Sequence, residues 1–266
     1  MISLCVTHDQ ALRSDAESAA RDQGFEINPR PVVQIDCGRD PDFGPSHKDW
    51  PRVLARIDKL EPGQDAYINW EYPDHYALRS SPGLAQLRVK QTLAAAIRNK
   101  GCRAGIYGPV RIQANSMLST TETSLYHLEI VGHFLDFVVI PVYVGTHFEA
   151  GDPAATRYML NTVAVMREAR ARLPQSVEIM AAFQFSVRPS GTTREPMTEY
   201  EASVMGRVIA ASGATPLWWY EAREGNADAI DRRSDESARL GGVFRTGLER
   251  HRVDRNMDVG DPQGVE

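Results

Sequence analysis

The chain has 266 residues, of which 42% are hydrophobic and 24% are charged. This composition is typical of one large globular domain or two small ones, and it excludes collagen-like, coiled-coil and disordered chains. The net charge is −5 and no clustered basic surface is evident in the sequence, which argues against nucleic acid or an anionic membrane as the main partner.

The first ten residues lack the basic start and apolar core of a signal peptide. The most apolar stretch, Phe134–Val144, is too short to cross a bilayer. We therefore expect a soluble protein that is cytoplasmic, or that is released without a classical signal or carried in a virion. Three widely separated cysteines, with no metal-ligand spacing, are expected to be free thiols.

Short apolar runs recur about every 30–40 residues, the length of one strand-and-helix unit. Most of them carry apolar residues at consecutive positions, as strands buried on both faces of a parallel sheet do. The predicted strands are Ile2–Thr7, Pro31–Asp36, Ala66–Glu71, Arg103–Tyr107, Asp136–Val144, Val177–Phe185 and Thr215–Glu221.

Amphipathic segments with clear ends lie between these runs. Leu84–Asn99 has apolar residues near one face, and a glycine follows it. Asp152 is the expected N-cap of a helix that ends before Pro174. Thr198 begins a capping box, and Gly213 ends the helix that follows.

Alternating strands and helices fit a closed barrel or an open doubly wound sheet. The chain has neither GxGxxG nor GxxxxGK[ST], the glycine-rich turns of nucleotide-binding open sheets. We therefore predict an α/β fold of the (β/α) TIM-barrel type, as one domain over residues 1–253 with a polar tail over 254–266. Chemistry in such barrels takes place at the carboxyl ends of the strands.

The third predicted strand ends in Asn69-Trp70-Glu71. Because side chains alternate along a strand, Asn69 and Glu71 share a face and would point into the barrel. A carboxyl group desolvated there can have its pKa raised, as a general acid requires. The alternative is a structural ion pair of Glu71 with a loop arginine such as Arg79 or Arg111.

The segment Asp65–Pro73, DAYINWEYP, resembles the DGxDxDWEYP signature of chitinase-type glycoside hydrolases and the IDWE strand of hyaluronidases. Further segments follow in the order of the hyaluronidase family. Arg103–Pro109 is similar to its GYYGxP strand, Val139–Val144 to its PSIYL strand, and Val204–Trp219 to its closing helix and GxVLWG strand. The resemblance implies a distorted barrel of about seven strands.

The resemblance also implies roles for three residues. Glu71 corresponds to the catalytic acid, and Tyr143 to a tyrosine beside the substrate's acetamido group. In this family the acetamido oxygen attacks the anomeric carbon while the glutamic acid protonates the leaving oxygen, without a cofactor. Asn69 replaces the aspartate that holds the acetamide and balances the positive charge of the intermediate, so that activity depends on whether an amide suffices. The implied substrate is an N-acetylated polysaccharide.

Other residues at the strand ends are candidates for substrate contacts. The alternatives are loop stabilisation for Asp36, core packing for the aromatic residues and a rim salt bridge for Glu221. They are Asp36, Tyr107, Gln184, Trp218, Trp219 and Glu221. A carboxylate pair of Glu71 and Glu221 would allow retention at about 5–5.5 Å or inversion at about 6.5–9.5 Å. His147 and Glu149 also follow a strand, but two ligands do not define a metal site, and we predict none.

Two other functions are compatible with the sequence. A barrel that has lost catalysis could bind carbohydrate or serve as a structural component of an assembly with unidentified protein partners. A barrel enzyme for phosphorylated metabolites would need a glycine-rich phosphate loop after a late strand, and Gly191 and Gly225 are too isolated to form one.

Overall fold

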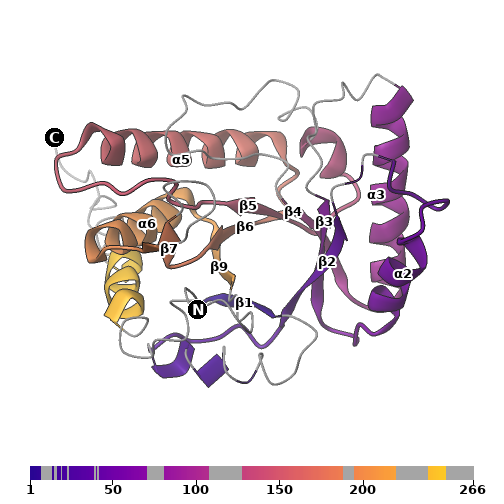
Figure 1. Cartoon of the computed structure of the whole chain (residues 1–266), viewed down its shortest axis with the longest axis horizontal. Helices are drawn as coiled ribbons and strands as arrows, with labels where there is room; N and C mark the ends of the chain where they lie inside the picture. Colours follow the sequence, from indigo (N-terminus) through magenta and orange to yellow (C-terminus); the bar gives the residue numbers. More distant parts are fainter. Residues whose placement is uncertain are drawn as a thin grey trace, which may run out of the picture.

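Seven parallel strands of the described chain close into a barrel in the computed structural model (Figure 1). The structure describes residues 1–6, 14, 17–18, 20–22, 24–38, 40, 42–70, 81–107, 128–187, 195–219 and 239–249. The barrel strands are β1 (Ser3–Val6), β2 (Val32–Gly38), β3 (Asp65–Trp70), β4 (Arg103–Tyr107), β5 (Phe137–Pro141), β6 (Glu178–Phe183) and β9 (Thr215–Trp219). Strand β9 pairs with both β6 and β1, which closes the sheet and confirms the predicted barrel.

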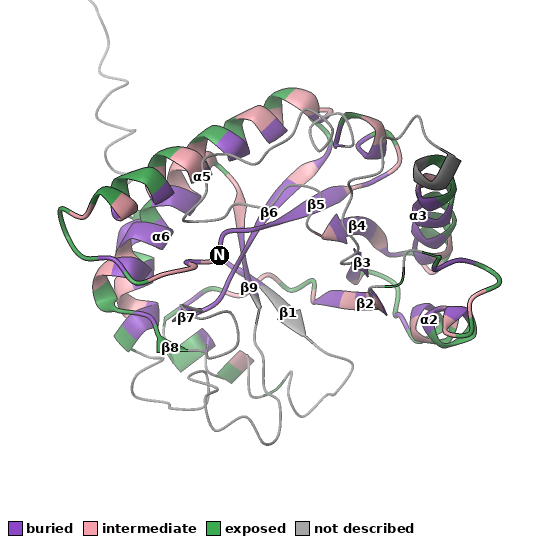
Figure 2. Ribbon diagram, turned by 45° about the horizontal axis from the view of Figure 1, so that its top comes forward, coloured by how far each residue is buried: buried purple, intermediate pink, exposed green. Residues whose placement is uncertain are grey.

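Helices cover the outside of this barrel, and Figure 2 shows that their buried faces turn toward the strands. They are α2 (Trp50–Asp58), α3 (Ser81–Asn99), α5 (Pro153–Arg172) and α6 (Glu199–Ser212), followed by a helical segment over residues 239–249. A two-stranded antiparallel sheet of β7 (Ser186–Val187) and β8 (Glu195–Pro196) lies between β6 and α6 in the sequence. None of the described helices is long and apolar enough to span a membrane.

The predicted starts of α5 and α6 and the predicted end of α6 are confirmed, whereas α3 begins at Ser81 and not at the predicted Leu84. The Asp152 side chain accepts from the Ala154 amide at 2.7 Å. Thr198 and Glu201 form the capping box of α6, and Gly213 ends that helix with φ 70°. Helix α2 was not among the predicted elements.

Alternation along the strands separates two apolar layers. The inner layer fills the barrel and consists of Val32, Tyr67, Phe137, Val139, Met180, Ala182 and Leu217, with Tyr107 packed against it. The outer layer lies between the strands and the helices and contains most of the other buried apolar residues. It includes Cys37, and Cys37 and Cys102 are both buried and free, as predicted.

A charged network lies at the amino-terminal end of the barrel, where β3, β4 and β6 begin. The Arg103 guanidinium lies 3.4 Å from the Asp65 carboxylate and 2.5 Å from that of Glu178. Thr215, the first residue of β9, donates a hydrogen bond to Glu178. Burial raises the pKa of the fully buried Asp65 to about 6, although Arg103 favours its charged form. These contacts connect four strands at the end of a barrel that usually contributes to stability rather than to catalysis.

Candidate functional site

Five of the predicted site residues lie on the inner face of the barrel wall, at the carboxyl ends of five successive strands. They are Asp36, Asn69, Tyr107, Tyr143 and Gln184, from β2, β3, β4 and the residues just after β5 and β6. We call them the inner rim. The structure thus brings together groups that are 148 positions apart in the sequence, from 36 to 184.

Their orientation follows from their neighbours. Asn69 lies between Ile68 and Trp70, which both belong to the outer layer, while the strand position two before it belongs to the inner layer. Gln184 lies between two phenylalanines of the outer layer, and Tyr143 between two of its valines. Because successive side chains in extended backbone point to opposite faces, each of these three faces the interior.

Asn69 is a buried polar group near the carboxyl end of β3. Its side chain is 4% exposed, and its Oδ1 atom has no hydrogen-bond partner among the described residues. Asp36 is its partner in the register between β2 and β3. The Asp36 carboxylate accepts a hydrogen bond from the Gly38 amide at 3.0 Å, which fixes it at the end of β2.

The two rim tyrosines contact each other. The Tyr107 hydroxyl donates to the Tyr143 hydroxyl at 3.0 Å. The Tyr67 ring stacks on Tyr107 with 5.8 Å between centroids, and the Tyr67 hydroxyl donates to Gln34 at 2.8 Å. The stacked Tyr67 ring and the hydrogen bond to Tyr143 therefore hold Tyr107 in place, and Tyr107 in turn orients Tyr143.

Gln184 follows the last residue of β6 and is 3% exposed. Its Oε1 atom has no hydrogen-bond partner in the described part of the chain. The neighbouring Phe183 stacks on Phe244 at 4.4 Å, and Phe185 packs edge-on against the same ring. These contacts anchor both neighbours of Gln184 in the outer layer, so that Gln184 itself is directed inward.

Trp218 is not brought to the inner rim. It belongs to the outer layer, is fully buried, and packs edge-on against Phe185 with 5.5 Å between centroids. The preceding Leu217 belongs to the inner layer. We therefore leave Trp218, a predicted substrate contact, out of the proposed site.

Three other predicted residues cannot be placed with the rim. Glu71 and Glu221 lie outside the described residues, as does the side chain of Trp219, the last residue of β9. The distance between the Glu71 and Glu221 carboxylates, which would distinguish a retaining from an inverting mechanism, therefore remains a sequence-based prediction.

An aromatic cluster that the sequence interpretation missed supports the end of β3 from outside. The Phe43 ring contacts Trp50 and Trp70 with centroid distances of 5.5 and 5.6 Å. The Trp70 indole donates to the Asp40 carbonyl at 2.9 Å, and the Lys90 ammonium lies 5.7 Å from the Trp70 ring centre. The spacing of aromatic residues between 43 and 50 was the available signal. The cluster therefore holds the end of β3, which contains Asn69, in place.

His147, considered above for metal binding, lies between two carboxylates. Its Nδ1 is 3.0 Å from Glu201 and its Nε2 is 3.1 Å from Glu195. Glu201 is fully buried and also accepts from the Phe148 amide at 2.8 Å. Within the described ranges, no three His, Cys, Asp or Glu side chains are grouped so that they could hold a metal ion.

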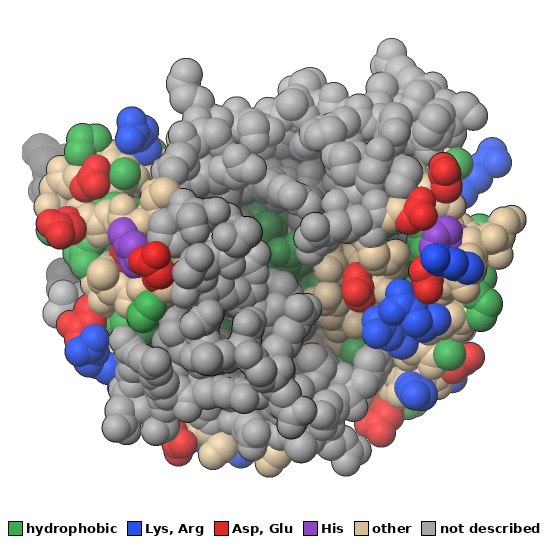
Figure 3. All heavy atoms as spheres, in the orientation of Figure 1, with side chains coloured by type: hydrophobic (Ala, Val, Ile, Leu, Met, Phe, Trp, Pro, Cys, Tyr) green, Lys and Arg blue, Asp and Glu red, His purple; other side chains and the backbone are tan. Residues whose placement is uncertain are grey.

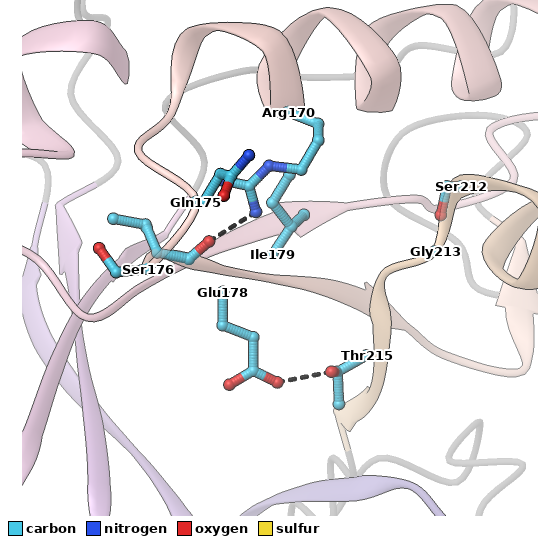
Figure 4. A pocket seen from close by; sticks show the side chains of 9 residues that line it. Arg170, Gln175, Ser176, Glu178, Ile179, Ser212, Gly213 and Thr215 are labelled. Atoms are coloured by element: carbon cyan, nitrogen blue, oxygen red, sulfur yellow. Dashed lines mark hydrogen bonds between the residues drawn. The ribbon is translucent and has the colours of Figure 1, made fainter.

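A hollow of about 280 Å³ lies at the opposite end of the barrel, at the starts of β6 and β9 (Figure 4). The Arg170 guanidinium beside it donates to three backbone carbonyls, those of Leu173, Pro174 and Val177. Glu178 in its wall accepts from Thr215. The charged groups that line this hollow are therefore already hydrogen-bonded to other groups of the protein.

The described surface shows acidic and basic side chains intermixed on the face seen in Figure 3, without a large basic patch among the residues that are drawn in colour.

The fold is shared with known carbohydrate-active barrels. Bee venom hyaluronidase superposes with a TM-score of 0.64 at 10% identity, over 92% of this chain and 99% of that one. The same enzyme in complex with a hyaluronic acid tetramer gives 0.63 at 10% identity, over 91% and 98%. A class V chitinase from Pseudomonas fluorescens Pf-5 gives 0.51 at 11% identity, over 91% and 100%.

These likenesses confirm the predicted resemblance to hyaluronidase and chitinase barrels at the level of the fold. No protein-family model matches the sequence. No curated protein matches it either.

Proposed function

We propose that this protein is a glycosidase-type barrel that acts on an N-acetylated polysaccharide, with Glu71 as the general acid. The observation that carries the proposal is the gathering of Asn69, Tyr143 and their neighbours on the inner rim. Glu71 follows Asn69 by two positions, so it would join the same inner face if the alternation of β3 continued.

The chemistry assigned to these groups needs no protein nucleophile. The acetamido oxygen of the substrate attacks the anomeric carbon, and Glu71 donates its proton to the leaving glycosidic oxygen. Asn69 would hold the acetamide by hydrogen bonding. The Tyr143 hydroxyl, oriented by Tyr107, would donate to the same acetamide. Water then opens the cyclic intermediate, with the Glu71 carboxylate as base.

The proposal is tested by hydrolysis of chitin, hyaluronan and peptidoglycan by the wild type and by Glu71→Gln. Loss of the acid should lower the rate on the preferred substrate by about 10²–10⁴-fold. Glu168→Gln is the matched control, because Glu168 lies on α5 in an ion pair with Arg172, away from the rim. Equal hydrolysis by wild type and Glu71→Gln would remove Glu71 from the mechanism.

A second function is favoured by one specific residue. Asn69 brings no negative charge to balance the cationic intermediate, so the barrel could bind an N-acetylated sugar without cleaving it. A wild-type protein that binds such oligosaccharides and cleaves none of the three polymers would support this binding function over the enzymatic one.

A further inference from the structure

Two side-chain amides of the inner rim are buried with an unused acceptor. Asn69 is 4% exposed and Gln184 is 3% exposed, and neither Asn69 Oδ1 nor Gln184 Oε1 has a hydrogen-bond partner among the described residues. A buried amide oxygen without a donor destabilises the folded protein, because it has lost its hydrogen bonds to water. Such groups in a native fold need an explanation, and a ligand that supplies the missing donors is one.

The two amides lie on different sides of the barrel interior. Asn69 is on β3 and Gln184 follows β6, three strand steps away in a barrel of seven described strands. Neighbouring strands are about 4.8 Å apart, so three steps carry Gln184 roughly halfway round the wall. Both oxygens are hydrogen-bond acceptors, so they cannot satisfy each other, and a group bound between them could donate to both.

The surroundings of the amides indicate what kind of group fits. The inner layer below them is apolar, with Val139, Ala182 and Leu217 among its members. Two hydroxyls lie between them, that of Tyr107 on β4 and that of Tyr143 just after β5. An apolar floor with neutral acceptors and hydroxyls at its edge suits a sugar ring, which has apolar faces and N–H and O–H groups around its circumference.

The charge of the inner rim further restricts the class of sugar that fits. Of the described inner-rim side chains, the one that carries a charge is Asp36, and it is acidic. A sugar with a carboxylate would meet this negative charge, without a described basic partner on the rim to offset it. A neutral sugar has no such cost.

We infer that Asn69 and Gln184 together bind a neutral N-acetylated sugar. Gln184 contacts this ligand from the side of the barrel opposite β3, the strand that precedes Glu71. This inference rests on the proposed function, and it specifies its substrate class: a polymer of neutral N-acetylhexosamines, as distinct from one that contains uronic acids such as hyaluronan. Gln184 accepts from an N–H or O–H group of the sugar, as does Asn69.

The test is a calorimetric titration of the Glu71→Gln protein, in which the ligand is not expected to be consumed. The two probes are tetra-N-acetylchitotetraose and a hyaluronan tetrasaccharide of equal length. We expect the neutral tetrasaccharide to bind at least about tenfold more tightly. Addition of Gln184→Met should weaken its binding by about tenfold, because the acceptor is lost while the shape is kept.

Two further measurements separate a ligand contact from a structural role. Gln184→Met should leave the melting temperature unchanged or raise it, because an unpaired buried amide is replaced by an apolar chain. A structural amide would lower it. Gln86→Met is the matched control, since Gln86 is a buried amide on α3 that is not part of the rim, and it should leave the affinity unchanged.

Four results would overturn the inference: no binding of the neutral tetrasaccharide, equal or tighter binding of the hyaluronan tetrasaccharide, unchanged affinity in Gln184→Met, or a lower melting temperature of Gln184→Met. None of them decides the proposed function. A protein that cleaves hyaluronan through Glu71 and does not bind the neutral probe would keep the proposed function and refute the sugar assignment. Neutral-sugar binding through Gln184, with hydrolysis independent of Glu71, would do the reverse.

Discussion

Among the single residues, Asn69 raises the main chemical question, which is whether an amide can support the proposed reaction. Its amide can orient an acetamide by hydrogen bonding, but it supplies no charge opposite the cationic intermediate that the proposed mechanism forms. The surrounding structure holds this position firmly, since Trp70 packs in the aromatic cluster outside the barrel and Asp36 pairs with Asn69 across β2 and β3. A substitution that changes only the charge is therefore informative.

We predict that Asn69→Asp increases hydrolysis of N-acetylated polysaccharide. A preorganised charged group in a water-poor site stabilises the transition state by an amount comparable to one oxyanion-hole donor, about 10²–10³-fold in rate. The measurement is reducing-end release from the best of the three polymers. Asn69→Leu serves as a control that keeps the position neutral and removes the hydrogen bond, and it should not gain activity. A rate for Asn69→Asp equal to or below that of wild type would contradict the charge argument.

The inner rim also shows where residue-level prediction from sequence works. Asn69 and Tyr143 were predicted to face the interior from alternation and family position, and their neighbours in the outer layer place them there. The sequence alone does not show which of the two adjacent tryptophans of β9 points inward, because both are large and apolar and either layer could accommodate them. The packing of Trp218 against Phe185, 33 positions earlier in the chain, decides its layer, and no local pattern contains that contact.

Among the secondary-structure elements, α6 begins with a local capping motif whose glutamate also makes tertiary contacts. Thr198 caps the helix by accepting from the Glu201 amide at 3.2 Å, and Glu201 accepts from the Thr198 amide at 2.7 Å. The sequence predicts this capping box directly. It does not predict that the same Glu201 carboxylate also accepts from the Phe148 amide and contacts His147, in the loop after β5. That loop also contains Tyr143, so Glu201 connects the start of α6 to the inner rim.

We predict unequal losses of stability when the two partners of this capping box are truncated. Thr198→Ala removes one cap hydrogen bond and should lower the free energy of unfolding by about 1 kcal/mol. Glu201→Ala leaves the Thr198 and Phe148 amides without their acceptor and His147 with Glu195 alone, and should cost about 3 kcal/mol or more. Urea denaturation of both variants gives the comparison. Losses of the same size would mean that Glu201 acts as a helix cap alone.

Helix α2 shows why some elements were missed. It is short, with nine residues, and it buries Trp50, Val53 and Ile57 on one face. Asp49 and the proline that follows Trp50 are typical of a helix start, although the Asp49 side chain makes no capping bond in the structure. The helix is stabilised by packing against β2 and by the contact of Trp50 with Phe43, which are tertiary interactions.

For the molecule as a whole, the two ends of the barrel have different kinds of polar groups. The carboxyl end has the neutral amides and hydroxyls of the inner rim. The amino end has the ion network of Arg103 with Asp65 and Glu178, whose members come from three strands. The number and order of the strands were predictable from the recurrence of apolar runs, but this network was not. Its residues are up to 113 positions apart, from 65 to 178, and they meet only when the barrel closes.

This network leads to a prediction about pH and stability. Burial raises the pKa of Asp65 from 3.8 to about 6 in the folded protein. Between these two values the folded chain holds a proton that the unfolded chain has released, so the Asp65 contribution makes the free energy of unfolding fall as pH rises from about 4 to about 6. Below this range the contribution is fully favourable, and above it the loss is complete.

Asp65→Asn should remove this dependence, since the amide does not titrate. We expect the free energy of unfolding of Asp65→Asn, relative to wild type, to increase between pH 4.5 and 6.5, and Arg103 keeps its ion pair with Glu178 in the variant. The measurement is urea denaturation at pH 4.5, 5.5 and 6.5. Asp58→Asn, which removes an exposed carboxylate near Lys100, is the control for losing a surface charge. A difference between Asp65→Asn and wild type that is constant or decreases with pH would show that Asp65 is charged in the folded barrel throughout this range, and that Arg103 offsets the cost of its burial.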